Sequence, residues 1–118
     1  MEKIKREKIE KEKEQHEYLS SVNRAREIAP TFLLTTSARD YTDSIGRELS
    51  DFYFRSIDAS IVFGILERRI FECKRHMIEK ALQLEAEVVV DIYPIISGQY
   101  SNVVYMIGTA LIPKQKRI

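Results

Sequence analysis

The strongest pattern of apolar and polar positions lies between residues 61 and 84. Apolar side chains recur there at steps of three and four, the period of a helix with one buried face. That stripe consists of Phe63, Leu66, Ile70, Cys73, Met77, Ala81 and Leu84. The residues expected on the solvated side are Glu67, Arg68, Arg69, Lys74, Arg75 and Glu79. Asp58 and Ser60 precede the stripe and are candidate helix caps. A stripe this broad predicts that the helix packs against two neighbours. The first is a sheet, and the candidate for the second is another subunit.

Two strands are predicted after this helix. From Glu87 to Ile92 the residues alternate, so Val88, Val90 and Ile92 should share one face and Val89, Asp91 and Tyr93 the other. The segment 97–102 reads SGQYSN, a hairpin loop around Gly98. Val103–Pro113 is the returning strand, in which Gly108 marks a bulge or a close approach of another backbone.

Further β structure is predicted before the helix. Residues 31–36, TFLLTT, are rich in β-branched and aromatic side chains and indicate a strand. SARDYTDS follows as a cluster of turn and cap formers. Within Ile45–Ile57, three consecutive aromatic residues favour a second strand, regular or bulged. The predicted fold is α+β, a small antiparallel sheet packed on one long helix in β-α-β-β order.

From Tyr18 to Ile28 the first helix becomes more apolar and is expected to pack on the body, whereas residues 1–17 form a run that cannot build a core. Lys and Glu dominate it at helical spacing, and Ile4 and Ile9 are the only aliphatic residues before Leu19. Three interpretations remain open: a solvated helix, a coiled-coil arm between copies, or disorder. Pro30 is expected to end the helix. We therefore divide the chain into a charged helical arm, 1–29, and an α+β domain, 30–118.

Composition narrows the classes of function. A chain of 118 residues holds one modest core, and its 19 basic residues balance its 18 acidic ones, so nucleic-acid binding is not expected. No apolar run has the length of a membrane span, and the N-terminus lacks a signal-peptide pattern. A single cysteine, Cys73, excludes an intrachain disulfide and fits the cytoplasm.

The C-terminal half resembles the YbjQ-like family, whose members carry a heavy-metal-binding label. Two motifs carry the likeness: Glu85-Ala86-Glu87-Val88-Val89-Val90 after a long helix, and Gly108-Thr109-Ala110-Leu111 on the last strand. The resemblance extends over roughly residues 31 to 113. The resemblance implies a dodecin-subunit-like fold assembled as a ring-shaped homopentamer. Glu85 stands where the family has a glycine, and the family's glycine-rich stretch before the helix is missing.

Assembly is also expected without the resemblance. A small sheet covered on one side by one helix leaves a face and two edges unprotected, and copies of the chain can cover them. We expect a homo-oligomer, with a protein partner through residues 1–28 as the alternative role of the arm.

One pair of residues has metal-ligand character. Cys73 and His76 lie three residues apart on the predicted helix, with Glu72, Glu79 or a neighbouring subunit as further ligand sources for a divalent or soft metal ion. Because Cys73 falls on the apolar stripe, the leading interpretation is a core cysteine. His76 is expected at the surface or an interface, and His16 in solvent.

The remaining chemistry is sparse. Asp91 interrupts a valine strand and should be exposed or paired between subunits; a ring of carboxylates that holds a cation is the alternative. The sequence contains no phosphate loop, His-Glu-x-x-His motif, nucleophile elbow or cysteine pair, so no enzyme is predicted. The expected function is a non-enzymatic, homo-oligomeric small domain with a metal or small ligand between subunits, or a scaffold whose arm tethers a partner.

Overall fold

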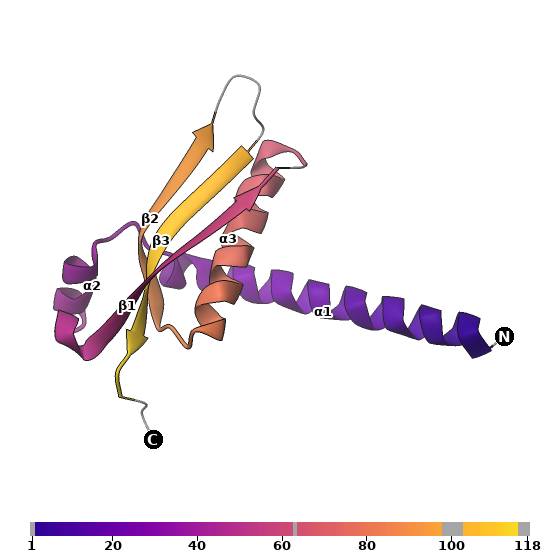
Figure 1. Ribbon diagram of the computed structural model, residues 1–118, viewed down its shortest axis with the longest axis horizontal. Helices are drawn as coiled ribbons and strands as arrows, with labels where there is room; N and C mark the ends of the chain where they lie inside the picture. Colours follow the sequence, from indigo (N-terminus) through magenta and orange to yellow (C-terminus); the bar gives the residue numbers. More distant parts are fainter. Residues whose placement is uncertain (1, 63, 98–102, 116–118) are drawn as a thin grey trace.

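A computed structural model describes residues 2–62, 64–97 and 103–115, and it has the predicted α+β class (Figure 1). The helices are α1 (Glu2–Phe32), α2 (Ala38–Ser44) and α3 (Leu66–Gln83), with a short 3-10 helix at Leu49–Asp51. The strands are β1 (Phe52–Ile61), β2 (Val88–Ser97) and β3 (Val103–Pro113). No helix in these ranges is long and apolar enough to cross a membrane.

The three strands form one antiparallel sheet in the order β1-β3-β2. β3 lies in the centre, where Ile57 of β1 faces Gly108 and Ile95 of β2 faces Tyr105. The order of elements from β1 onward, β-α-β-β, is the predicted one. Both remaining edges of the sheet belong to strands, β1 and β2, that pair on one side only.

α3 covers one face of this sheet and confirms most of the predicted stripe. Cys73, Met77 and Ala81 have no exposed surface. They pack in one cluster with the strand residues Ile57, Ala59, Ile61, Val89, Val104, Met106 and Ala110. The stripe is weaker at its start, where Leu66 is 43% exposed, and Phe63 lies outside the described residues.

The predicted start of this helix is wrong. Asp58 and Ser60 do not cap α3, because both lie in β1, which extends to Ile61. The long β3 pairs with all ten residues of β1, so Asp58 and Ser60 are held in extended backbone and cannot form the first turn of a helix. α3 begins at Leu66 after Ile65, which makes no side-chain cap.

The end of the helix contains an unusual backbone conformation. Glu85 has φ of 60°, the left-handed region that favours glycine, at the position where the resembled family has one. The Ala86 amide donates to the Ala81 carbonyl at 2.9 Å, and the Glu85 amide to Leu82 at 3.0 Å. These two bonds form a Schellman motif, which ends the helix and turns the chain into β2.

Two predictions fail around Pro30. α1 passes through this proline to Phe32, and the Leu33 amide still donates to the Ala29 carbonyl at 3.0 Å. Proline removes a single hydrogen bond in the last turn, while Phe32 gains a buried position in the core. The segment 31–36 is consequently not a strand of the sheet; only Leu33 makes an isolated parallel bridge, to Val89.

The cluster of turn formers that follows is a helix. Ser37 caps α2 by accepting a hydrogen bond from the Asp40 amide at 3.1 Å. α2 then packs on one end of the sheet face opposite α3, together with the preceding Leu34. The buried residues beneath it are Phe52, Val88, Val90 and Leu111. The β segment predicted within Ile45–Ile57 is confirmed as a strand only from Phe52.

The predicted alternation of β2 is wrong beyond Val90. Asp91 has φ of 52°, and the pairing register shifts between Val90 and Tyr93, so a bulge lies opposite Gly108. Ile92 therefore turns to the α3 side. A Cβ at Gly108 would approach its Cδ1 to 2.6 Å and Val89 Cγ1 to 2.8 Å. The predicted bulge at this glycine exists, but the extra residue is on the neighbouring strand.

Candidate functional site

The Cys73 thiol is a group of the hydrophobic core. Its Sγ donates to the Ala59 carbonyl at 3.2 Å and lies 3.8 Å from the Val104 carbonyl. Burial raises the pKa of this thiol, against a smaller opposing effect of Lys80. A protonated, inaccessible thiol is a poor nucleophile and a poor metal ligand. The leading interpretation, a core cysteine, is confirmed.

His76 lies one turn along α3 and belongs to a different environment. Its Nε2 is 3.2 Å from Nη2 of Arg75. Because a guanidinium can only donate, this ring nitrogen accepts, so the proton of the neutral ring is on Nδ1. The ring is half-buried and lines a cleft of about 490 Å³ together with Tyr18, Ile61, Gly64, Arg68 and Glu72.

The predicted metal pair is therefore divided between the core and a cleft. Cys73 contacts strand carbonyls, while His76 contacts Arg75. In the described ranges, no group of three or more His, Cys, Asp and Glu side chains could hold a metal ion. Metal binding by Cys73 and His76 stays a prediction, and titration with zinc, copper and nickel of the Cys73→Ala and His76→Ala variants tests it.

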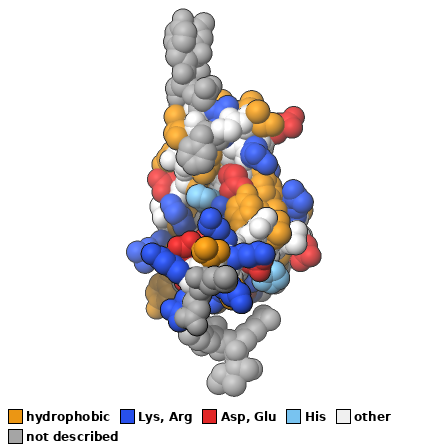
Figure 2. Space-filling view, turned by 90° about the vertical axis from the view of Figure 1, so that its right-hand side faces the viewer, with side chains coloured by type: hydrophobic (Ala, Val, Ile, Leu, Met, Phe, Trp, Pro, Cys, Tyr) orange, Lys and Arg blue, Asp and Glu red, His pale blue; other side chains and the backbone are white. Residues whose placement is uncertain are grey.

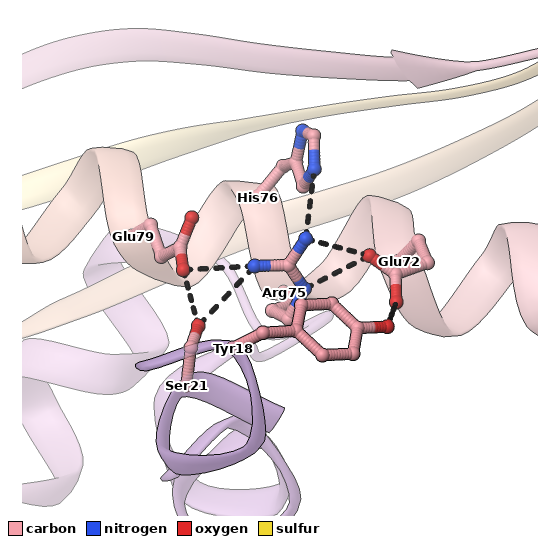
Figure 3. Close-up of polar contacts among 6 residues, drawn as sticks. All are labelled: Tyr18, Ser21, Glu72, Arg75, His76 and Glu79. Carbon is pink, nitrogen blue, oxygen red and sulfur yellow. Dashed lines mark hydrogen bonds and ion pairs between the residues drawn. The ribbon is translucent and has the colours of Figure 1, made fainter. Parts of the chain in front are cut away.

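The most highly connected polar group is the Arg75 guanidinium, which joins α3 to α1 (Figure 3). Its Nε donates to Glu72 Oε2 at 2.8 Å, and Nη1 donates to Glu79 Oε1 at 2.9 Å. Nη1 also donates to Ser21 Oγ of α1 at 3.2 Å, and the Ser21 hydroxyl in turn donates to Glu79. Bidentate and charge-assisted bonds of this kind hold a planar guanidinium in one orientation.

Tyr18 completes this polar junction from the α1 side. Its hydroxyl donates to Glu72 Oε1 at 2.9 Å, and the Arg75 guanidinium carbon is 5.2 Å from the centre of its ring. The hydrogen bond to Glu72 raises the pKa of Tyr18. Burial acts to raise the pKa of Glu72, but hydrogen bonds from Arg75 and Tyr18 outweigh it and hold this pKa below its usual value.

This junction was not predicted, because Arg75 was expected on the solvated side of the helix. The side chain of Arg75 is only 12% exposed, since α1 lies across it. A signal was present in the spacing of Glu72, Arg75 and Glu79, which places two carboxylates within one turn of the arginine. Spacing within one helix does not reveal that a second helix covers these charges.

Arg69 was also expected in solvent and is instead 7% exposed. Its Nε and Nη1 have no hydrogen-bond partner in the part of the chain that the structure describes. Buried guanidinium N–H groups that lack a hydrogen-bond partner are costly. The described residues of one copy therefore leave this position incompletely satisfied.

A second polar group fixes α2 to the sheet. Glu87 accepts from Arg47 Nη1 at 2.6 Å and from the Tyr41 hydroxyl at 2.9 Å. Burial, and then this hydrogen bond, raise the pKa of Tyr41 to about 12. The Arg47 guanidinium also stacks 4.2 Å from the centre of the Phe52 ring. These contacts hold the segment around α2 against the sheet, and they occupy the side chains of Tyr41, Arg47 and Glu87.

The other predicted residues occupy exposed positions. Asp91 is exposed at the bulge, and its amide donates to the Thr36 carbonyl at 2.9 Å. A ring of Asp91 carboxylates between copies stays a prediction. His16 is exposed on α1, as expected.

Comparison with known proteins supplies no relative. No family model matches the chain, and no curated protein and no solved structure matches it either. The likeness to the YbjQ-like family consequently rests on the short motifs in the sequence.

Proposed function

We propose that the protein is a non-enzymatic, homo-oligomeric assembly domain. The observation that carries the proposal is the partly covered sheet: α3 packs on one face, whereas α2 covers only one end of the other. Tyr93 and Phe54 stay 62% and 48% exposed on that second face. Large aromatic side chains at such exposure are typical of surfaces that another protein covers.

The polar groups favour a structural role over catalysis. Arg75, Glu72, Glu79 and Tyr18 bond to one another and join two helices. Cys73 is inaccessible in the core. A nucleophile, general base or metal ligand has to reach its substrate, and these groups are occupied by contacts within the fold.

The family resemblance supports a specific size of assembly. The element order β1-α3-β2-β3 and the left-handed residue at Glu85 agree with what the resemblance implies. The segment 31–36 departs from it, because it lies beside the sheet without forming a strand. The resemblance implies a ring of five copies. We propose in addition that a metal or small ligand binds between the subunits.

The outer half of α1 favours a second role, presentation of a helix to a partner. The side chains of residues 3–17 are all exposed, and the helix projects away from the sheet (Figure 1). Figure 2 views the molecule from the N-terminal end of α1, with Lys, Arg, Asp and Glu side chains intermingled around it. A helix of mixed charge that is fixed at its inner end would be a suitable tether between the assembly and another protein.

Light scattering tests the proposal directly. The mass in solution is expected to be at least twice the 13.8 kDa of one chain. A scan of the same sample for bound metals tests whether a metal ion lies between subunits. Five copies would support the ring implied by the resemblance. A folded species of 13.8 kDa at high concentration would overturn assembly as the function.

A further inference from the structure

Three surfaces of the sheet could meet a second copy: the outer edge of β1, the outer edge of β2, and the face opposite α3. The edges would add strands through backbone hydrogen bonds, whereas the face would pack side chains. The contacts within one copy decide between these modes. They block much of both edges and leave the face open.

The edge of β1 is occupied by a charged side chain. Lys80 extends from α3, its Nζ donates to the Asp58 carbonyl, and it lies 3.6 Å from Asp58 Oδ1. A lysine against an edge strand opposes the approach of another strand, because pairing would displace and desolvate the ammonium group. Arg55 is a second exposed charged residue of this strand.

The edge of β2 is partly covered by the segment after α1. The Leu34 amide donates to Val89 at 2.9 Å, and Leu34 and Thr36 accept from Ile92 and Asp91 at 3.0 and 2.9 Å. Beyond the bulge the strand contains Pro94, which has no amide proton to donate. Continuous pairing of another strand along β2 is therefore prevented.

In the part of the chain that the structure describes, the face opposite α3 carries no comparable protection beyond α2. We call the residues of this face beyond α2 the open face: Phe54, Ser56, Asp58, Ser60, Tyr93, Ile95, Tyr105, Ile107 and Thr109. Their common orientation follows from the register, since Asp58 and Tyr93 both lie opposite Ile107, and Ser60 and Ile95 opposite Tyr105. Tyr93, Phe54 and Ile95 are 62%, 48% and 37% exposed.

The charge on the open face suits contact with its own copy. Asp58 is its only ionisable carboxylate, and it accepts from the Tyr105 hydroxyl at 2.9 Å and is paired with Lys80. Two such faces can approach without two bare like charges meeting. A contact between identical patches has to be self-complementary in this sense.

The large side chains of the open face supply about half of the area that a standard interface takes from each partner. A fully buried aromatic side chain removes roughly 150–250 Å² from water, and a standard interface takes about 800 Å² from each partner. The exposed Tyr93, Phe54 and Ile95, together with the half-buried Tyr105 and Ile107, supply about half of that area. The hydroxyl-bearing residues around them supply a polar rim.

We infer that the open face of one copy packs against the open face of a second copy, with Tyr93 as a central contact. This inference rests on the proposed function, because it names the surface through which assembly occurs. It also differs from edge-to-edge pairing, which would use the backbone of β1 or β2.

Two tyrosines provide a matched test. Tyr93 on the open face is 62% exposed, and Tyr53 on the opposite face of β1 is 60% exposed. Tyr93→Lys should weaken self-association at least about tenfold and halve the mass measured by light scattering, because it places a cation opposite its own copy. Tyr53→Lys should leave the mass unchanged. Phe54→Lys gives an independent second variant of the open face.

The outcomes separate this inference from the proposed function. If the wild type is a single copy, both fail. If it contains five copies, assembly stands and the open-face contact is overturned, because a contact between identical faces joins copies in pairs, whereas a ring of five needs two different surfaces on each copy. If it is oligomeric and Tyr93→Lys and Phe54→Lys keep its mass while their circular dichroism stays native, assembly stands and the open face is wrong. If the Tyr53→Lys control also loses mass, the effect is not specific to the open face, and the inference is again overturned.

Discussion

At the scale of single residues, burial has a stronger effect on the chemistry of this protein than residue type does. Cys73 has a reactive functional group but lies in the core, where burial raises its pKa. Arg75 has a side chain typical of surfaces but is enclosed by carboxylates, a serine and a tyrosine ring. Sequence spacing identified the apolar setting of Cys73 correctly and placed Arg75 wrongly in solvent.

Cys73 should react only when the fold opens. We expect the native protein to resist a water-soluble disulfide reagent, because a buried thiol with a raised pKa provides little accessible thiolate. The measurement is the rate at which the reagent releases its own thiol on reaction with Cys73, with and without denaturant. Fast labelling of the native protein, at the rate found in denaturant, would contradict the core position.

Tyr41 should make the protein sensitive to alkali. Its folded pKa of about 12 lies above the ordinary 10.0, so the folded state holds the proton more tightly than the unfolded state. The resulting stabilisation is complete below pH 10 and is lost as the pH rises through about 12. Unfolding followed by circular dichroism should show this loss, and Tyr41→Phe should reduce it. An identical profile for the variant would refute the assignment.

At the scale of elements, the fold depends on how helices and strands meet. β3 pairs on both sides, the β2 bulge turns Ile92 toward α3, and Gly108 leaves room for it. α1 joins the body through the polar contacts of Arg75 and through its buried residues Val22, Ala25 and Phe32. Each junction involves residues that are distant in sequence.

Gly108→Ala should destabilise the sheet. The new Cβ would lie 2.6 Å from Ile92 Cδ1 and 2.8 Å from Val89 Cγ1. Ile92 can change rotamer, but Val89 is a short branched residue, so we expect a loss of about 1–3 kcal/mol in the free energy of unfolding. Denaturant unfolding measures this loss.

Arg75→Ala should loosen α1 from α3. Removal of the guanidinium leaves Glu72, which is 18% exposed, without its charge partner, at a cost of about 2–3 kcal/mol. Amide exchange in residues 18–32 should become faster than in β3. Arg68→Ala, at an exposed position about two turns before Arg75 on α3, is expected to leave this exchange unchanged. Equal protection in both variants would show that the apolar contacts suffice.

At the scale of the whole molecule, one compact α+β body carries a helix that extends well beyond it. The Cα atoms span 59 × 48 × 20 Å, and the long helix accounts for much of that anisotropy (Figure 1). Residues 3–17 of α1 have exposed side chains, so the sheet and α3 do not depend on them for their core. The arm and the body should consequently be separable.

Removal of residues 2–15 should preserve the folded body. We expect the melting temperature to change by no more than about 2 °C, because the side chains of residues 3–15 are all exposed. Calorimetry on the truncated and full-length chains provides the comparison. A large drop in melting temperature would mean that the arm is part of the stabilising structure, for example through contacts between copies.

The sequence by itself determined the periodic features: the stripe on α3, the paired valine-rich strands, the α+β class and the buried setting of Cys73. These features depend on repeats of two or about 3.6 residues, which are visible in a single chain. It misplaced the start of α3 and the strand at 31–36, because local propensity does not show which segments β3 will pair with.

Only the tertiary structure decided the features that depend on distant partners. The bulge at Asp91 faces Gly108, α1 continues through Pro30 because Phe32 reaches the core, and Arg75 is covered by Tyr18 and Ser21. No local pattern encodes these contacts, since each joins residues more than 15 positions apart whose proximity follows from packing. The open face belongs to the same class, because its exposure depends on how far α2 extends across the sheet.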